Sequence, residues 1–182
     1  MKLVVDLFQN GFWNSDMIII AHRGNVDGPN PKRENSPDYI NEALSMGYDV
    51  EIDLRTKDKR LYLGHDKAQY PVNLEWLYKN RERLWIHCKD RESLEFCSST
   101  DMNLHYFWHD RDSYTLTSKA IGWVMVGQIP YNNSIIVLPE SISYYDKYEG
   151  KYDRILESKG ICTDKCNHYQ KELNEIVELK EI

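Results

Sequence analysis

The run Met17-Ile18-Ile19-Ile20-Ala21, followed at once by His22-Arg23-Gly24, is the stretch that points most directly to a fold. Its apolar side chains are continuous, without polar alternation, which is typical of a strand buried on both faces in a parallel sheet. Two ionisable side chains and a glycine stand where such a strand ends. We therefore predict a buried first strand that carries polar residues at its carboxyl end.

A helix and a second strand are predicted directly after this run. The polar loop 25–33 leads into residues 36–46, whose apolar positions recur at helical spacing. Ser36 precedes a proline and fits the start of a helix, and Gly47 is placed to end it. Residues 48–54 then alternate as a strand does.

Further short strands are predicted along the rest of the chain, most of them separated by helical or polar segments: 61–63, 84–87, 104–108, 123–126, 135–138 and 161–163. This alternation predicts an α/β protein with the repeat of a (β/α) TIM-type barrel. A complete barrel of this type takes about 250 residues, and this chain has 182. We therefore expect a shortened barrel, trimmed between Glu140 and Gly160, whose closure with eight strands is left open.

The chain is predicted to hold one barrel domain, residues 17–182, after an N-terminal extension of undefined role, residues 1–16. Its composition, 41% hydrophobic and 29% charged, is that of a globular domain. The net charge of −6 disfavours a nonspecific nucleic-acid binder, which needs a basic surface. The longest apolar run, Met17 to Ala21, is too short for a transmembrane segment.

Four cysteines bear on the compartment: Cys88, Cys97, Cys162 and Cys166. They lack the two matched pairs that a zinc site requires, so we expect them reduced and unligated. Residues 1–16 do not resemble a signal peptide. Together these features predict a cytoplasmic protein.

Ionisable residues gather at the predicted strand ends, where the strands of a parallel barrel converge on one opening: His22, Arg23, Glu51, Asp53, His65, His87 and Lys89. Cleavage of a phosphodiester requires a general base, a general acid, a hard cation held by carboxylates, and fixed positive charges for the phosphate. His22 and His65 can supply the acid and the base. Glu51 and Asp53, two positions apart on one strand face, can hold the cation, and Arg23 and Lys89 can bind the phosphate.

Four motifs in this order resemble the glycerophosphodiester phosphodiesterase family, within the phosphatidylinositol-phosphodiesterase-like barrel superfamily: Ala21-His22-Arg23-Gly24, Glu34-Asn35-Ser36, Val50-Glu51-Ile52-Asp53-Leu54 and Gly64-His65-Asp66. The second half of the chain matches more thinly, through residues 86–89 and 160–164. The resemblance implies that His22 and His65 are the catalytic histidines and that Glu51 and Asp53 bind one divalent cation, Mg²⁺, Ca²⁺ or Mn²⁺. It also implies that Arg23 contacts phosphate and that Lys89 matches the downstream lysine of the family, while Glu34 is a further site candidate.

His87 is where the sequence departs from that family, which has a glutamate there as a third metal ligand. An imidazole removes one negative charge and lowers the preference for Ca²⁺ or Mg²⁺. If His87 ligates the ion, Mn²⁺ or Zn²⁺ is favoured. If it does not, Mg²⁺ with several retained waters is the expected occupant.

Three functions remain open from the sequence. The first is hydrolysis of a small-molecule or polysaccharide-linked glycerophosphodiester. The second keeps the same site but uses a hydroxyl of the substrate and ends at a cyclic phosphate. The third is a catalytically weak phosphoester-binding module. His109 and Asp164, each at the end of a predicted strand, and Trp123 are left open as pocket residues.

Overall fold

The computed structural model describes residues 17–141 and 151–178, so the predicted extension 1–16 and the segment 142–150 lie outside the described residues. Its strands are β1 (Ile18–His22), β2 (Asp49–Lys57), β3 (Arg60–Leu63), β4 (Tyr70–Pro71), β5 (Leu84–Cys88), β6 (Tyr106–Phe107), β7 (Tyr114–Leu116), β8 (Gly122–Val124), β9 (Ser134–Val137) and β10 (Gly160–Thr163). Its helices are α2 (Pro37–Ser45), α3 (Leu74–Asn80), α4 (Arg91–Ser99), α6 (Lys151–Glu157) and α7 (Cys166–Glu178), with a 3-10 turn η1 (Pro139–Ser141).

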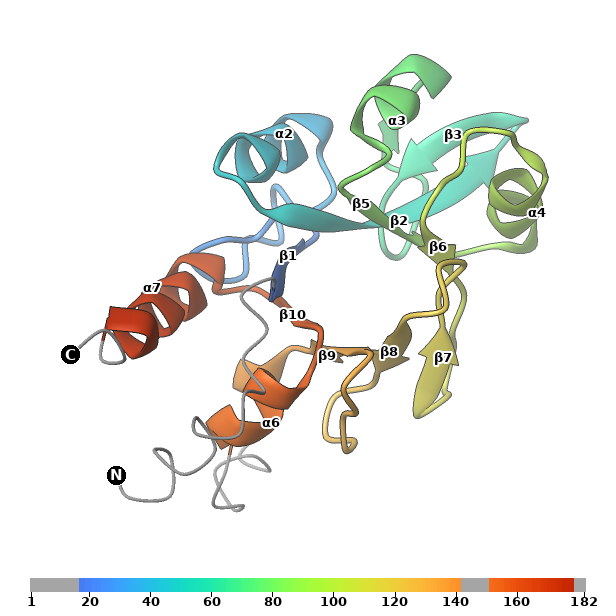
Figure 1. Ribbon diagram of the computed structural model, residues 1–182. Coiled ribbons are helices and arrows are strands. Elements are labelled where there is room, and N and C mark those ends of the chain that lie inside the picture. The colour runs from blue at the N-terminus through green and yellow to red at the C-terminus, as the bar shows by residue number, and fades with distance from the viewer. Residues whose placement is uncertain (1–16, 142–150, 179–182) are drawn as a thin grey trace.

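All of these strands belong to one curled, mixed sheet (Figure 1). Its parallel part runs in the order β6-β5-β2-β1-β10-β9-β8. The antiparallel strands β3 and β4 extend the far end of β2, and β7 pairs antiparallel with β8. Within residues 17–141 and 151–178 no ladder joins β6 to β7 or β8, so the sheet curls round without closing.

The predicted (β/α) TIM-type barrel, even in shortened form, is wrong. Such a barrel places a helix after each parallel strand, whereas the chain passes from β6 through β7 and β8 to β9 without any helix. Residues 108–133 are rich in Asp, Ser, Thr, Asn and Gly and lack helical spacing of apolar residues, so they form a hairpin and loops. The missing elements therefore lie here, and not between Glu140 and Gly160, where the described part includes α6.

The predicted helix 36–46 is confirmed as α2, with the expected ends. The Ser36 side chain accepts a hydrogen bond from the Tyr39 N–H, and Pro37 occupies the first turn, where a missing N–H costs nothing. After the helix, Gly47 adopts φ 98°, a left-handed conformation that favours glycine. The buried face of α2 includes Tyr39 and Ile40 and rests on β2.

Helices cover the outer face of the sheet, where α2 and α4 contact β2, α7 contacts β1, and α6 contacts β10 (Figure 1). The main apolar core joins strand residues such as Ile52 to helix residues such as Ile40. A second, smaller apolar cluster gathers residues of six strands: Ile20, Trp85, Phe107, Trp123, Ile135, Val137 and Cys162.

This second cluster determines where the polar side chains lie. Side chains alternate along a strand, so a residue two positions further on shares the same face. His22 follows Ile20 in this way, and His87 follows Trp85. The inner face of the curl is therefore apolar at one level and polar at the carboxyl ends of the parallel strands.

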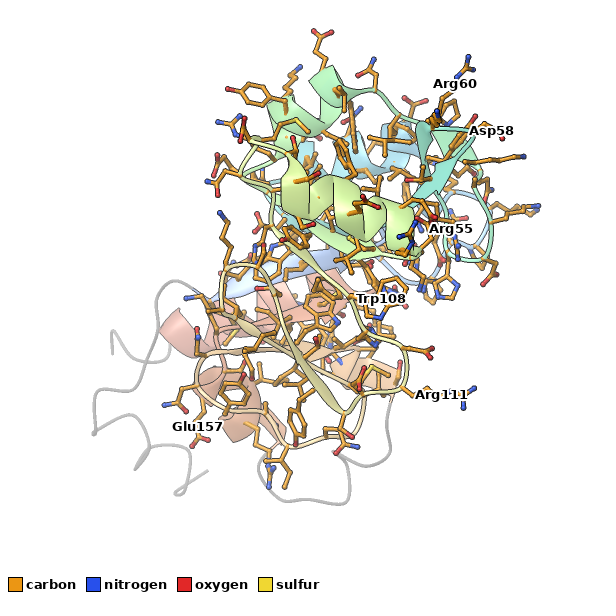
Figure 2. The ribbon with its side chains drawn as sticks, turned by 90° about the vertical axis from the view of Figure 1, so that its right-hand side faces the viewer. Arg55, Asp58, Arg60, Trp108, Arg111 and Glu157 are labelled. Atoms are coloured by element: carbon orange, nitrogen blue, oxygen red, sulfur yellow. The ribbon has the colours of Figure 1, made fainter. Side chains whose placement is uncertain are left out.

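Outside the curl, the hairpin of β2 and β3 ends in a charged turn, where Asp58 and Arg60 point into solvent (Figure 2). All four cysteines are buried and free. None of the helices in the described part has both the length and the apolar character that crossing a bilayer would need.

Candidate metal centre and its cavity

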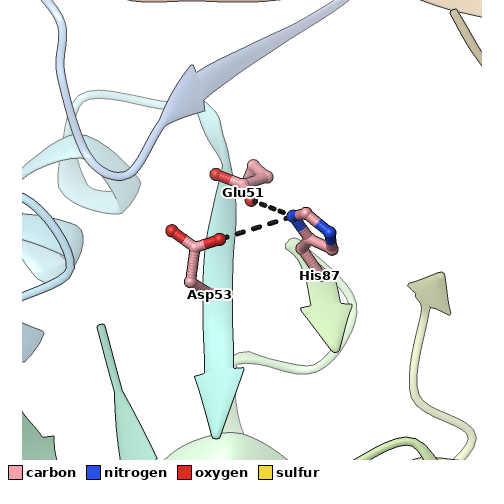
Figure 3. A group of neighbouring side chains, drawn as sticks. All are labelled: Glu51, Asp53 and His87. Carbon is pink, nitrogen blue, oxygen red and sulfur yellow. Dashed lines mark ion pairs between the residues drawn. The ribbon is translucent and has the colours of Figure 1, made fainter. Parts of the chain in front are cut away.

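Glu51, Asp53 and His87 form a compact group on β2 and β5 (Figure 3). Asp53 and His87 are register partners across the parallel ladder, and Glu51 shares the strand face of Asp53. The His87 Nδ1 atom lies 3.4 Å from Asp53 Oδ1 and 3.7 Å from Glu51 Oε1. One ligand atom from each residue lies within 4.8 Å of the others. The structure therefore brings together the three residues that the sequence proposed as ligands.

Two carboxylate oxygens of this group, one on Asp53 and one on Glu51, lack the hydrogen-bond partners that buried carboxylates normally have. The Asp53 side chain is 0% exposed and the Glu51 side chain 3% exposed. Asp53 Oδ1 and Glu51 Oε2 are buried with no hydrogen-bond partner. Buried polar atoms without a partner are rare and costly. A cation would satisfy both oxygens, so this group could bind a metal ion.

The ring of His87 is held with its Nδ1 atom toward the carboxylates. Its Nε2 atom lies 3.3 Å from the backbone oxygen of His109, and the ring stacks against Phe107 and His109 at 4.9 and 4.6 Å between centroids. In the tautomer that carries its proton on Nε2, the ring would donate to that oxygen and present the Nδ1 lone pair to an ion held by Asp53 and Glu51. Metal-binding histidines are commonly oriented by such a bond to a backbone carbonyl.

The two carboxyl groups of the candidate metal centre ionise under different conditions. Burial by itself would raise the pKa of Asp53, but the nearby His87 ring and the charges of Arg23 and Lys89 hold the pKa of Asp53 well below its usual range. Burial and the neighbouring Asp53 charge raise the pKa of Glu51. Asp53 is thus the permanently charged member of the group.

Two fixed cations flank Asp53. Arg23 directly follows β1 at φ 54°, and its N–H donates to the Glu51 carbonyl at 3.0 Å. Its Nε atom lies 3.0 Å from Asp53 Oδ2, and Nη1 donates to Glu34 Oε2 at 3.3 Å. Lys89 Nζ lies 3.6 Å from Asp53 Oδ1. Glu34 is therefore a residue that holds Arg23.

Asn35 stands beside the site candidate Glu34 in the motif Glu34-Asn35-Ser36, and the sequence left open whether this pair has a direct role or only shapes the loop. Its side-chain N–H donates to Asp53 Oδ2 at 2.8 Å, and its side-chain oxygen accepts from the Asp53 backbone N–H at 2.9 Å. It is 1% exposed and has φ 64°, a conformation that asparagine tolerates well. Asn35 therefore holds the Asp53 carboxylate directly.

His22 is fixed by an aspartate from the far end of the chain. Its Nδ1 atom lies 2.8 Å from Asp164 Oδ1, and the same oxygen accepts from Asn25 Nδ2 at 2.8 Å. Burial lowers the pKa of His22, but the hydrogen bond to Asp164 and the charge of Glu51 outweigh it and raise this pKa above its ordinary value. Because Nδ1 is engaged, Nε2 is the ring nitrogen left for proton transfer.

His65 lies on a loop whose shape depends on glycine and arginine. At Gly64, φ is 145° and an added Cβ would lie 2.2 Å from the Lys67 carbonyl oxygen, so a side chain does not fit. The Arg55 guanidinium donates to the carbonyl oxygens of Gly64 and His65. The His65 side chain is 42% exposed, with its Nδ1 atom 2.6 Å from Asp66 Oδ1.

These groups meet at one cavity of about 420 Å³. Its polar lining consists of His22, Arg23, Glu51, His65, His87, Lys89, His109 and Asp110. Asp53 and Glu34 are not among the lining residues and lie behind them. Both predicted catalytic histidines thus face the same space as the candidate metal centre.

The remaining lining residues are apolar and come from β8, β9 and the residues just after them: Trp123, Met125, Val126, Val137 and Leu138. We call this set the apolar wall. Trp123 is 3% exposed and stacks on Phe107, so it serves both packing and the cavity. His109 also lines the cavity, where burial lowers its pKa to about 4.

A scan against protein families and a search of curated proteins both find no match to this chain.

Proposed function

We propose that this protein is a metal-dependent phosphodiesterase that cleaves a glycerophosphodiester-like substrate, as its motif resemblance to the glycerophosphodiester phosphodiesterases suggests. The observation that carries the proposal is the shared cavity, which His22, His65, Arg23 and Lys89 line together with two members of the candidate metal centre. Few other chemistries require two histidines, a carboxylate cation site and two fixed cations within one cavity.

The charge balance suits a divalent cation next to a phosphodiester anion. The carboxylates of Glu34 and Asp53 lie against the cations Arg23 and Lys89. Asp164 is paired with His22, and Glu51 lies 3.7 Å from the His87 ring. The excess negative charge favours a divalent ion, which would be held by Glu51, Asp53 and His87. When bound, such an ion offsets the charge that develops on the phosphoryl oxygens.

The protein's own side chains divide the remaining work. Arg23 and Lys89 hold the phosphate oxygens. His65 removes a proton from the attacking water as the new P–O bond forms. His22, whose pKa is raised above its ordinary value, gives its Nε2 proton to the departing alkoxide as the old P–O bond breaks. Asp164 keeps the His22 ring in the tautomer and orientation that this step requires.

The metal ion in this proposal is Mn²⁺, because two carboxylates and an imidazole suit it better than Ca²⁺. His87→Glu should restore a third carboxylate and shift the preference toward Mg²⁺ or Ca²⁺ while keeping activity. The test compares the rates with each ion at saturating concentration. An unchanged order of metal preference in that variant would contradict direct ligation by His87.

A second candidate function is a phosphoester-binding module. The exposure of His65, at 42%, favours it, since a catalytic base normally has a fixed position. The deciding experiment is turnover of bis(p-nitrophenyl) phosphate with and without Mn²⁺. Metal-dependent release of p-nitrophenol that is lost in both His22→Ala and His65→Ala supports the enzyme. Metal-dependent binding of the diester without release supports the module.

Hydrolysis and cyclisation differ only in the attacking group. A hydroxyl of the substrate in place of water leaves a cyclic phosphate with the same acid and base. Phosphorus NMR of the product of glycerophosphoethanolamine separates the two reactions.

A further inference from the structure

The cavity has two chemically different sides. The charged side chains come from the carboxyl ends of β1, β2 and β5 and from the loops beside them. Across from them, the apolar wall presents five residues without a single side-chain hydrogen-bond donor or acceptor other than the indole N–H of Trp123. A phosphodiester bound at the charged side therefore has one of its two alcohol groups against this wall.

The backbone at Leu138 shows how the fold positions a side chain of the apolar wall. It follows β9 at φ 46°, a strained conformation for leucine, and its N–H donates to the Cys162 carbonyl at 2.7 Å. Arg23 has the same arrangement after β1, with φ 54° and its N–H bonded to the next strand. The same left-handed backbone conformation after a strand thus places the Arg23 cation on one side of the cavity and the branched apolar side chain of Leu138 on the other.

The backbone of the apolar wall offers few free donors. The Leu138 N–H is bonded to Cys162, and the Met125 N–H donates to the Ser113 carbonyl at 3.1 Å. A polyol such as glycerol would lose its hydrogen bonds to water here without replacing them, which is unfavourable. An apolar alcohol group would instead bury its surface against Val137 and Leu138.

From this arrangement we infer, on the basis of the proposed function, that the substrate carries one compact apolar alcohol, aryl or short alkyl, seated on the apolar wall. A volume of about 420 Å³ lies at the low end of the range for small-molecule sites. It has room for a phosphate and one such group.

The test uses three glycerol phosphodiesters that differ in the second alcohol: benzyl, hexyl and 2-hydroxyethyl. All three leaving groups are primary alcohols, so differences in leaving-group acidity are small. We expect kcat/KM to be about tenfold or more higher for the better of the two apolar esters than for the 2-hydroxyethyl ester. Benzyl above hexyl identifies a ring, and the reverse identifies a chain. Equal values, or a preference for 2-hydroxyethyl, overturn the inference.

Two variants locate the preference. Leu138→Asn keeps the left-handed backbone, which asparagine adopts readily, and Met125→Gln preserves the side-chain length. Each should reduce the apolar preference at least threefold, since an apolar contact is replaced by an unpaired amide. The control Leu116→Asn lies on β7, is 62% exposed and is not part of the cavity, so it should retain the wild-type ratio. A ratio unchanged in both wall variants contradicts the inference.

A binding measurement separates this inference from the proposed reaction. Calorimetric titration of the full chain with benzylphosphonate and with 2-hydroxyethylphosphonate, in the presence of Mn²⁺, requires no turnover. Tighter binding of the benzyl compound, with a more negative heat-capacity change, supports the inference even if no ester is cleaved. The absence of ester cleavage would contradict the phosphodiesterase proposal alone. Equal binding, or no binding of either phosphonate, overturns the inference. If the esters are cleaved although the two phosphonates bind equally or not at all, the proposed reaction is retained and only the inference about the apolar alcohol fails.

Discussion

Two histidines that line the cavity are each paired with an aspartate, and the two pairs are built in opposite ways. His22 and Asp164 come from positions 142 residues apart, and their side chains are 14% and 12% exposed. His65 and Asp66 are sequence neighbours whose side chains are 42% and 91% exposed. The first pair is fixed by the packing of β1 beside β10, whereas the second depends on a loop.

This difference determines how much each aspartate can contribute. Asp164 is held by Asn25 and partly shielded from water, so its bond to His22 is retained as the chain fluctuates. An exposed pair such as His65 and Asp66 is screened by solvent, and such pairs contribute little fixed orientation. We therefore expect changes at the buried pair to alter proton affinity and changes at the exposed pair to alter loop geometry.

Removal of either imidazole should have the largest effect. We expect His22→Ala and His65→Ala each to lower kcat by roughly 10²–10⁴-fold, the range for loss of a positioned acid or base. The measurement is turnover of a chromogenic diester at saturating Mn²⁺, with circular dichroism to verify folding. His168→Ala is the control, because His168 is 54% exposed on α7, outside the cavity lining. Either variant that retained more than about a tenth of the wild-type rate would lose its assigned role.

A change at the candidate metal centre should weaken metal binding, and the same substitution at the exposed pair should not. Asp53→Asn is expected to raise the Mn²⁺ concentration for half-maximal activity about tenfold or more, because a neutral amide is a poorer ligand than a carboxylate. Asp66→Asn, the same substitution at the rim, is the matched control. Metal titrations after exhaustive chelation measure both. Full activity without added metal would rule out the proposed centre.

The buried pair should also control the titration of His22. The bond to Asp164 raises the pKa of His22, so this pair stabilises the fold below the ordinary histidine pKa of about 6.5, and the stabilisation is lost as pH rises through the raised value. Asp164→Asn should lower the pKa of His22 and move the alkaline limb of the activity profile to lower pH. NMR titration of the ring protons measures the shift directly. Asp66→Asn should leave the His22 titration unchanged, and an equal effect of both variants would remove the distinction between the pairs.

The smallest effect is expected at the loop that carries the exposed pair. Arg55→Met removes the hydrogen bonds to the Gly64 and His65 carbonyls and should lower kcat about fivefold, the equivalent of one hydrogen bond of ~1 kcal/mol. Arg60→Met is the control, since Arg60 lies at the solvent-exposed tip of the hairpin (Figure 2). Rates at saturating substrate compare the two. Equal rates in both variants would show that Arg55 does not position His65.

The sequence by itself determined the individual elements. The apolar run before His22 indicated a buried strand, and the spacing after Ser36 indicated a helix, because strand and helix periodicities are local properties of a chain. The two-residue spacing of Glu51 and Asp53 was sufficient to place both carboxylates on one strand face. The composition of residues 108–133 already disfavoured helices, but the assumption of a repeating barrel overrode that local signal.

Only the tertiary structure determined which distant residues meet. The hydrogen bond between Asp164 and His22 requires β10 to lie beside β1. The hydrogen bonds of Asn35 to Asp53 require the loop before α2 to fold back over β2. No local pattern encodes either contact, because both depend on the order of strands in the sheet. The open edge of the sheet has the same origin. Whether β6 pairs with β8 depends on how the hairpin of β7 and β8 packs, since no helix follows these strands, and no single stretch of sequence specifies that packing.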